Sequence, residues 1–145
     1  CKWVVVDHLH MLVSASAEGD ERRTIDSIMT RLRSIVEETG AGVILVSHLR
    51  RIDGNKGHEN GIEVNLSHLR GSQSIAQLSD CVLALERNQQ SDDHQESQTT
   101  KVRVLKSRYT GDVGLACNLL YDSETGRLKE ISNEDLEVVD NKEGF

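Results

Sequence analysis

Two polar residues follow apolar runs in the first third of the chain, at positions where they could act on a nucleotide. Asp7 comes directly after the apolar residues 3–6, and His48 ends the run 42–48. A carboxylate at the end of a buried strand can hold the water shell of Mg²⁺ on nucleotide phosphates. The pattern before Asp7 therefore has the form of a Walker B strand. It also fits an ordinary strand end, and His48 alone also fits a hydrogen-bonded loop histidine.

Basic residues gather in the loop-like segment that follows. Glycine and asparagine residues between them supply mobility and positive φ angles, and loops of this length are usually functional or disordered. One interpretation is contact with a phosphate backbone. A solvated surface loop fits equally well, because Asp53, Glu59 and Glu63 lie in the same segment. The basic residues are Arg50, Arg51, Lys56 and His58.

A tight turn into a short helix is predicted at residues 69–80. Gly71 and Ser72 would present backbone N–H groups at the start of that helix, which is a seat for a phosphate. Further on, Lys106 and Arg108 lie two residues apart, so on a strand both would point to one face. Two such cations gain little unless an anion lies opposite, although a solvated basic edge that prevents aggregation is an equal alternative.

The surrounding pattern predicts the elements that position these residues. Residues 3–6 and 42–46 are apolar runs typical of strands buried on both faces of a parallel sheet. Between them, apolar residues recur at helical spacing, with Asp20 suited to the helix start and Gly40 to its end. Strand, helix, strand forms a parallel βαβ unit, so Asp7 and His48 should share one edge. The helical stripe is Ile25, Ile28, Met29, Leu32, Ile35 and Val36.

The second half of the chain predicts strands and turns. Residues 81–86 read as a third buried strand in which Cys81 is a small core residue. Residues 89–100 read as a polar loop tip. The β-like runs at 102–105 and 115–121 flank a glycine-containing turn and predict an antiparallel hairpin. The fold class is α/β, a mostly parallel sheet with helices on its faces and a hairpin near the C-terminus.

Composition limits the class of protein to which the chain can belong. The chain has 145 residues, of which 37% are hydrophobic and 28% charged, enough for one globular domain with a core. The net charge of -7 argues against a protein whose whole surface is basic for DNA binding, but it allows a local basic loop. No apolar run approaches the ~20 residues of a membrane span. The three scattered cysteines form no metal or disulfide pattern, which favours a reducing cytosol.

Several motifs occur in a specific order along almost the whole chain. After Asp7 and Ser47-His48 come Leu69-Arg70-Gly71-Ser72, then Leu85-Glu86-Arg87-Asn88-Gln89-Gln90, then Lys106-Ser107-Arg108-Tyr109-Thr110-Gly111-Asp112. This series resembles the C-terminal half of the motor domain of phage hexameric primase-helicases. That RecA-like family is related to the bacterial DnaB and mitochondrial replicative helicases.

The resemblance implies roles for matching residues. Asp7 looks like the Walker B aspartate on Mg²⁺, and His48 like the sensor of the γ-phosphate. Arg108 looks like an arginine finger that reaches the neighbouring subunit's nucleotide, with Lys106 near it. Arg87 and Tyr121 look like the pair that sandwiches the base. The basic loop and its supporting motif look like the DNA-binding part, which comprises Arg50, Arg51, Lys56, His58, Arg70, Gly71 and Ser72.

The family also implies the activity and the partners. The complete protein would hydrolyse ATP or dTTP with Mg²⁺, between subunits of a hexameric or heptameric ring, while moving along single-stranded DNA in the cytoplasm of an infected bacterium. The Gly-rich Walker A loop and the catalytic glutamate are absent from these 145 residues. We therefore expect a segment of a longer protein, inactive alone. The alternatives are a RecA-type recombinase or another RecA-fold ATPase, and a noncatalytic polymerase- or DNA-binding module.

The last residues differ in character from the rest. We expect residues 1–131 to form the motor segment and residues 132–145 an acidic tail that ends in Phe145. Such a tail is most often a solvated terminus. Acidic residues can also steer toward a basic patch while an aromatic ring anchors in a pocket. The resemblance implies that this tail docks on the replicative DNA polymerase.

Overall fold

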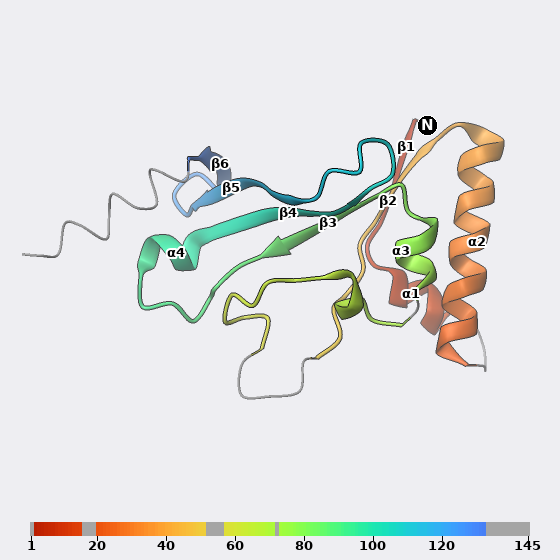
Figure 1. Ribbon diagram of the computed structural model, residues 1–145, viewed down its shortest axis with the longest axis horizontal. Helices are drawn as coiled ribbons and strands as arrows, with labels where there is room; N and C mark the ends of the chain where they lie inside the picture. Colours follow the sequence, from red (N-terminus) through yellow and green to blue (C-terminus); the bar gives the residue numbers. More distant parts are fainter. Residues whose placement is uncertain (1, 16–19, 52–56, 72, 133–145) are drawn as a thin grey trace, which may run out of the picture. The chain divides into compact units, whose positions relative to one another are not determined.

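The computed structural model describes residues 2–15, 20–51, 57–71 and 73–132. The chain divides into two units (Figure 1). Unit 1 contains Cys1–Arg50 and Leu66–Ser79, and unit 2 contains Arg51–Asn65 and Asp80–Phe145. None of the described helices is both long enough and apolar enough to cross a membrane.

Unit 1 is a βαβ unit with additional short helices. Strands β1 (Trp3–Val6) and β2 (Gly42–Leu45) pair in parallel, with Trp3 opposite Gly42 and Val6 opposite Leu45. This confirms the predicted parallel pair. The remaining elements of the unit are α1 (Leu9–Ser14), α2 (Glu21–Thr39), the 3-10 helix η1 (Leu66–His68) and α3 (Ser74–Leu78).

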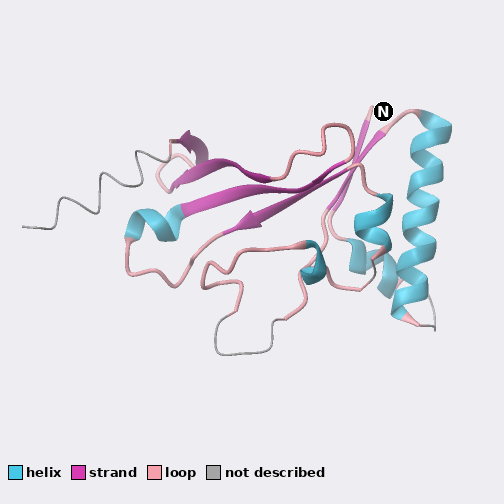
Figure 2. Ribbon diagram, in the orientation of Figure 1, coloured by secondary structure: helices cyan, strands magenta, loops and turns pink. Residues whose placement is uncertain are grey.

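Helix α2 begins and ends where its capping residues predict. The Asp20 side chain accepts a hydrogen bond from the Arg22 backbone N–H at 3.0 Å, which satisfies one donor of the first turn. Gly40 follows the last turn with φ of 67°, a left-handed conformation that favours glycine. Figure 2 shows α2 as the longest helix, with α1 and α3 beside it.

The core of unit 1 lies between these helices. Leu9, Ile25, Met29 and Ile75 are buried together, and Ile28, Leu32, Leu45 and Leu69 are among the side chains that pack against them. The stripe predicted on α2 therefore faces the core. Helix α1, which directly follows Asp7 and His8, was not predicted; its Leu9 is fully buried and attaches that helix to α2.

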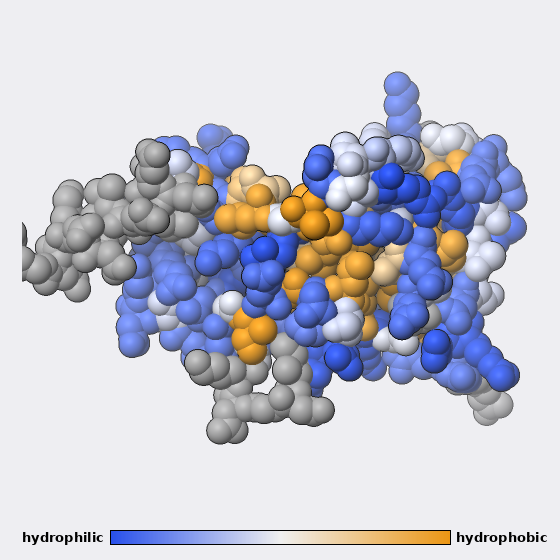
Figure 3. Space-filling view, in the orientation of Figure 1, coloured by the Kyte–Doolittle hydropathy of each residue, from blue (hydrophilic) through white to orange (hydrophobic). Residues whose placement is uncertain are grey.

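The prediction that β1 and β2 are buried on both faces is wrong for the described residues. Trp3 and Val5 are each 64% exposed and Ile44 is 51% exposed. The physical reason is that the sheet has two strands, and α1 and α2 pack on only part of it. The space-filling view shows apolar side chains at the molecular surface (Figure 3).

Unit 2 is built on a four-stranded antiparallel sheet in the order β3-β4-β5-β6. The predicted hairpin is its centre, and the third predicted strand pairs with it rather than with β1 or β2. The antiparallel part is thus larger than expected, and β6 was not predicted. The strands are β3 (Cys81–Glu86), β4 (Thr99–Ser107), β5 (Gly114–Asp122) and β6 (Arg127–Ile131).

Two smaller expectations in unit 2 are corrected. Cys81 is an exposed free cysteine rather than a core residue, because the alternating side chains of β3 point to two faces and its own face is open. The polar segment 89–100 is not only a loop. It contains helix α4 (His94–Gln98), whose first turn is capped by the Asp93 side chain accepting from the Gln95 N–H at 2.7 Å.

A buried carboxylate joins three segments of unit 2. Glu86 is 5% exposed, and its Oε1 accepts from the Val64 backbone N–H at 2.8 Å and from Arg103 Nε at 2.9 Å. Arg103 Nη2 also lies 3.3 Å from Glu63. The Glu86 hydrogen bond and charge raise the pKa of Arg103. Since a buried charge is tolerated only when it is paired, this network fixes segment 63–64 against β3 and β4.

Candidate active site

Asp7 and His48 follow neighbouring parallel strands, as predicted. The Val46 N–H donates to the Val6 carbonyl at 2.9 Å, which extends the strand pairing one residue beyond β2. The ring of His8, next to Asp7, lies 4.1 Å from the ring of His48 between centroids. Both Asp7 and His48 are exposed. The carboxyl edge of β1 and β2 therefore presents a carboxylate and an imidazole to solvent.

A third histidine completes a cluster at this edge. The ring centroid of His10 lies 5.8 Å from that of His48 and 6.1 Å from that of His8. One ligand atom from each of the three residues can be chosen so that all lie within 4.8 Å of one another. Only His48 was singled out from the sequence. The spacing His8-Leu9-His10 directly after a strand was the signal, but it required helix α1 to turn His10 back toward β2.

His10 is surrounded by charges of both signs. Its Nε2 lies 3.4 Å from Glu21 Oε1, and Arg70 Nε lies 3.5 Å from the same oxygen. Burial lowers the pKa of His10, and the positive charge of Arg70 lowers it further, whereas Glu21 opposes both effects. Burial and Arg70 together therefore disfavour the protonated form of His10.

The basic residues of unit 1 are linked to this edge through the backbone. Leu49 and Leu69 form an antiparallel bridge, flanked by the Arg50 N–H donating to His68 O at 2.8 Å and the Arg70 N–H donating to His48 O at 3.1 Å. Arg50 and Arg70 are both exposed. A displacement of the His48 backbone would thus reach Arg70 directly.

The other residues of the predicted DNA-binding part are placed differently. Arg51 and His58 belong to unit 2, where Arg51 is exposed and His58 half-buried. Lys56 and Ser72 lie outside the described residues. Gly71 has φ of 107°, and a Cβ there would come within 2.2 Å of Ile25 Cδ1, so only glycine fits. Helix α3 begins at Ser74, after Gln73, so the N–H groups of its first turn come from residues that follow the predicted pair Gly71 and Ser72 in sequence.

Lys106 and Arg108 do not share one strand, since β4 ends at Ser107. Lys106 is half-buried in β4 opposite Val82, whereas Arg108 begins the following turn. Arg108 Nη1 lies 3.2 Å from Asp80 Oδ1 in an exposed ion pair. The expectation that Lys106 and Arg108 point to one face of a strand is therefore wrong. Arg108 lies directly after the end of β4.

Arg87 and Tyr121 lie toward the opposite end of β4. Arg87 Nε donates to Ser97 O at 2.6 Å, and Nη2 donates to Gln98 Oε1 at 3.1 Å. Tyr121 follows Leu120, which pairs with Thr99, the residue after Gln98. The Arg87 side chain therefore contacts the end of α4, and Tyr121 lies one residue beyond the β5 residue that pairs with the start of β4.

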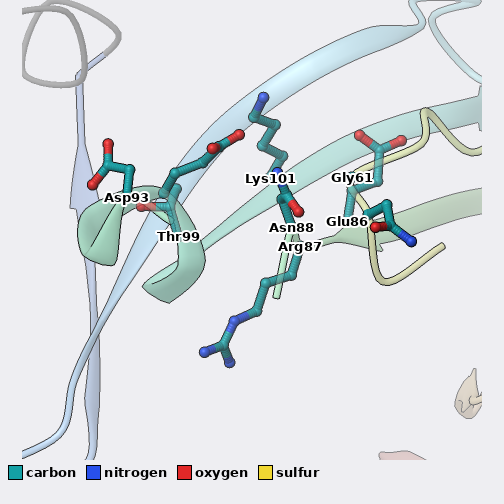
Figure 4. A pocket seen from close by; sticks show the side chains of 9 residues that line it. Gly61, Glu86, Arg87, Asn88, Asp93, Thr99 and Lys101 are labelled. Carbon is teal, nitrogen blue, oxygen red and sulfur yellow. The ribbon is translucent and has the colours of Figure 1, made fainter. Parts of the chain in front are cut away.

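A pocket of about 430 Å³ opens beside Arg87 (Figure 4). Tyr121 is not among its lining residues. Positive, negative and amide side chains all line it, so its chemistry is polar and mixed. The lining residues are Asn60, Gly61, Glu86, Arg87, Asn88, Asp93, Glu96, Thr99 and Lys101.

Comparisons with known proteins agree on one family. The family described as DnaB-like helicase C terminal domain matches residues 1–130. The chain is 44% identical over 132 residues to a DNA helicase/primase of Enterobacteria phage T3, covering 91% of this chain and 23% of that protein. It also resembles a solved DnaB-like replicative helicase, with a TM-score of 0.72 and 25% identity, over 90% of this chain and 30% of the other. The chain thus spans less than a third of either relative.

Proposed function

The chain belongs to the DnaB-like helicase C-terminal domain family, and on that premise we propose that it is part of a ring-forming replicative helicase. In the complete protein it would couple nucleoside triphosphate hydrolysis to movement along single-stranded DNA and to duplex unwinding. The observation that carries this proposal is the shared edge of β1 and β2, which brings Asp7 and His48 together. The backbone hydrogen bond from Arg70 to His48 then supplies a route from that edge to exposed basic side chains.

The proposed chemistry of Asp7 is metal binding. Mg²⁺ prefers oxygen ligands and keeps several waters, so the exposed carboxylate at the end of β1 has the donor type that fits it. Bound there, the metal would offset charge on the phosphates of ATP or dTTP. Asp7 would orient it, directly or through water.

The proposed role of His48 is to report the state of the nucleotide. A hydrogen bond from its imidazole to the γ-phosphate would be lost when that phosphate leaves. Because the His48 carbonyl accepts from the Arg70 N–H, a change in His48 would shift the 48–50 and 68–70 segments together. Arg50 and Arg70, with Arg51, Lys56 and His58 from the neighbouring loop, would hold the DNA backbone.

The proposed role of Arg108 is in the neighbouring subunit's site. An arginine supplied across an interface stabilises the charge that spreads over the transferred phosphoryl group. Lys106 would support it from β4, and Arg87 with Tyr121 would hold the base of the nucleotide. A hexameric or heptameric ring satisfies the need for a neighbour at every site. The ring would act in the cytoplasm of the infected host.

The decisive experiment compares Asp7→Asn with wild type in the complete protein. We expect Asp7→Asn to abolish hydrolysis and unwinding while leaving the ring intact, since only one charge at the strand edge is removed. Asp92→Asn, at an exposed aspartate of unit 2, is the matched control and should behave as wild type. Full hydrolysis by Asp7→Asn would contradict the assignment.

The alternatives give different outcomes in the same preparation. Electron microscopy of a recombinase would show open filaments on DNA instead of closed rings. A noncatalytic module would bind no nucleotide. The 145 residues alone should not hydrolyse nucleotide, because they contain no Gly-rich phosphate-binding loop.

A further inference from the structure

Three imidazoles converge at the edge of β1 and β2, which is more than a phosphate sensor requires. His8, His10 and His48 can each place one ring nitrogen within 4.8 Å of the other two. His8 is half-buried and His48 exposed, so the cluster is reachable from solvent. From this geometry we propose that the three histidines form a binding site for a divalent transition metal such as Zn²⁺.

The distances are close to those of a metal site. Zinc bound to histidine has Zn–N bonds of about 2.0–2.1 Å in a tetrahedral arrangement, which places ligand nitrogens about 3.3 Å apart. The separations of up to 4.8 Å in the metal-free cluster leave a gap of about 1.5 Å to close. Three protein ligands also leave a fourth position for water.

The donor set suits a transition metal better than Mg²⁺. Neutral imidazole nitrogen is a preferred ligand of zinc, nickel and copper, whereas Mg²⁺ takes oxygen. Within the described part of the chain, Nδ1 of His8 and Nδ1 of His10 are buried and have no hydrogen-bond partner. Buried polar atoms normally have partners, so an additional ligand at this place would complete the site.

The surroundings of His10 provide the orienting group that such sites have. Metal-binding histidines commonly direct their second nitrogen to a carboxylate. Glu21 lies 3.4 Å from His10 Nε2 and could play this part while Nδ1 faces the metal. Arg70 is the positive charge nearby, and its ion pair with the same Glu21 limits its repulsion of a cation. Asp7, next to His8 in sequence, contributes a negative charge at the same edge.

Ring packing alone is the competing explanation. His10 and His48 are nearly parallel, with an angle of 11° between their planes and 5.8 Å between their centroids, which lies within the range of aromatic pairs. Ring packing accounts for the orientation of His10 and His48, but it leaves Nδ1 of His8 and Nδ1 of His10 without hydrogen-bond partners in the described part of the chain. A bound metal accounts for the convergence and for the nitrogens together.

Metal binding would have a consequence for the motor, and this part rests on the proposed function. A metal that ligates His48 would occupy the imidazole that is to contact the γ-phosphate and would restrain its movement. Micromolar Zn²⁺ should therefore inhibit hydrolysis by the complete protein, and a chelator should restore it. His10 contributes to this inhibition without contacting the nucleotide.

The first test measures binding directly, using the complete protein without a histidine tag and with Co²⁺ as a spectroscopic substitute for Zn²⁺. We expect visible absorption bands of a four-coordinate Co²⁺ site that disappear when Zn²⁺ is added. His10→Ala should weaken Co²⁺ binding by more than about 100-fold, since even loss of an outer partner costs 10–100-fold. His94→Asn, at an exposed histidine of α4, should leave it unchanged. Equal affinity in His10→Ala and wild type, or thiolate charge-transfer bands, would overturn the site.

The second test separates the metal site from the motor. With Mg²⁺ present and no added Zn²⁺, His10→Ala should hydrolyse nucleotide like wild type, and its circular dichroism melt establishes that it is folded. With Zn²⁺, wild type and His94→Asn should lose most of their activity, whereas His10→Ala should not. Equal inhibition of all three proteins would overturn the coupling to His48. Absence of hydrolysis in wild type supplied with Mg²⁺ and no Zn²⁺ would instead contradict the proposed function, and the Co²⁺ spectra would still decide the site.

Discussion

Arg108 and Asp80 are joined twice: Arg108 Nη1 lies 3.2 Å from Asp80 Oδ1, and the Arg108 N–H donates to Asp80 O at 2.8 Å. The side chains of Arg108 and Asp80 are 42% and 32% exposed, so water screens the ion pair. Exposed pairs of this kind contribute only about 0–1 kcal/mol. The guanidinium can therefore leave Asp80 for a phosphate at small cost, while the backbone bond keeps its position.

In the complete protein, Arg108→Ala should lower the hydrolysis rate by roughly 10³-fold with little effect on nucleotide binding, as expected for an arginine finger. Arg127→Ala, at an exposed arginine of β6, is the control and should be active. Mixed rings give the sharper measurement. Subunits with Asp7→Ala retain Arg108 and should restore hydrolysis at Arg108→Ala neighbours. Mixtures no more active than either variant alone would argue against action across the interface.

Replacing Arg50 and Lys56 by alanine should weaken single-strand binding and reduce its dependence on salt. Each lost phosphate contact should remove about 0.7 from the slope of log K against log salt concentration. Fluorescence anisotropy of a labelled oligonucleotide at several salt concentrations measures that slope. Lys129→Ala, at an exposed lysine of β6, serves as the control. A slope identical to that of wild type would return the loop to an ordinary solvated surface.

Glu86→Ala should destabilise unit 2 by up to about 3 kcal/mol, because the mostly buried Arg103 loses its buried partner and keeps the exposed carboxylate of Glu63. Arg103 Nε and the Val64 N–H would both lose their acceptor. Hydrogen exchange at the Val64 amide reports this locally and should become faster. Glu130→Ala, at an exposed glutamate of β6, should change stability by less than about 0.5 kcal/mol. Unchanged protection of Val64 would refute the role of Glu86.

Protonation of His10 should destabilise unit 1 in acid. The folded-state pKa lies below the ordinary value of 6.5, chiefly because His10 is buried. Above pH 6.5 the imidazole is neutral in the folded and the unfolded state, and the full contribution of His10 to the stability of unit 1 is present. As the pH falls through the folded pKa, that contribution is lost, because the unfolded state binds the proton more readily. Chelator-treated protein should lose more stability between roughly pH 8 and pH 5 than its His10→Gln variant. Parallel losses would exclude His10 as the cause.

Removal of residues 134–145 from the complete protein should spare hydrolysis and unwinding but impair strand-displacement synthesis with the partner polymerase. These residues lie outside the described part of the structure, so this prediction depends on their acidity and on the terminal Phe145. Phe145→Ala should cause much of the same defect, and higher salt should enlarge it. Wild-type synthesis by both variants would leave the tail as a solvated end.

Local signals predicted α2 and the parallel pair correctly. Helix α2 begins directly after Asp20 and ends directly before Gly40, so each end is set by an adjacent residue. The apolar residues between these two positions follow the helical spacing throughout. The parallel pairing of β1 and β2 follows from the length of the crossover helix. Because these relationships are short-range or topological, the edge that carries Asp7 and His48 could be inferred.

Tertiary contacts decided what the sequence could not predict. The contact of His10 with Glu21 and the ion pair of Glu21 with Arg70 join residues from three separate helices and loops. The antiparallel sheet gained β3 because its strand pattern does not specify a partner: Leu83 and Leu85 alternate in a way that suits either a parallel or an antiparallel neighbour. The end of β4 at Ser107 likewise depends on the turn that Ser107 and Thr110 form through their hydroxyls.

The strand order has a consequence for how the chain acquires its structure. In β3-β4-β5-β6 every strand pairs with its neighbour in sequence, whereas β1 must wait for β2, which lies beyond two helices. Contacts close in sequence form faster, so we expect the antiparallel sheet to assemble before the parallel pair. Pulsed hydrogen exchange during refolding should protect amides of β3–β5 earlier than those of β1 and β2. The edge that carries Asp7 and His48 would then be among the last parts to form, so a newly made subunit gains its phosphate contacts only after its sheet scaffold is complete.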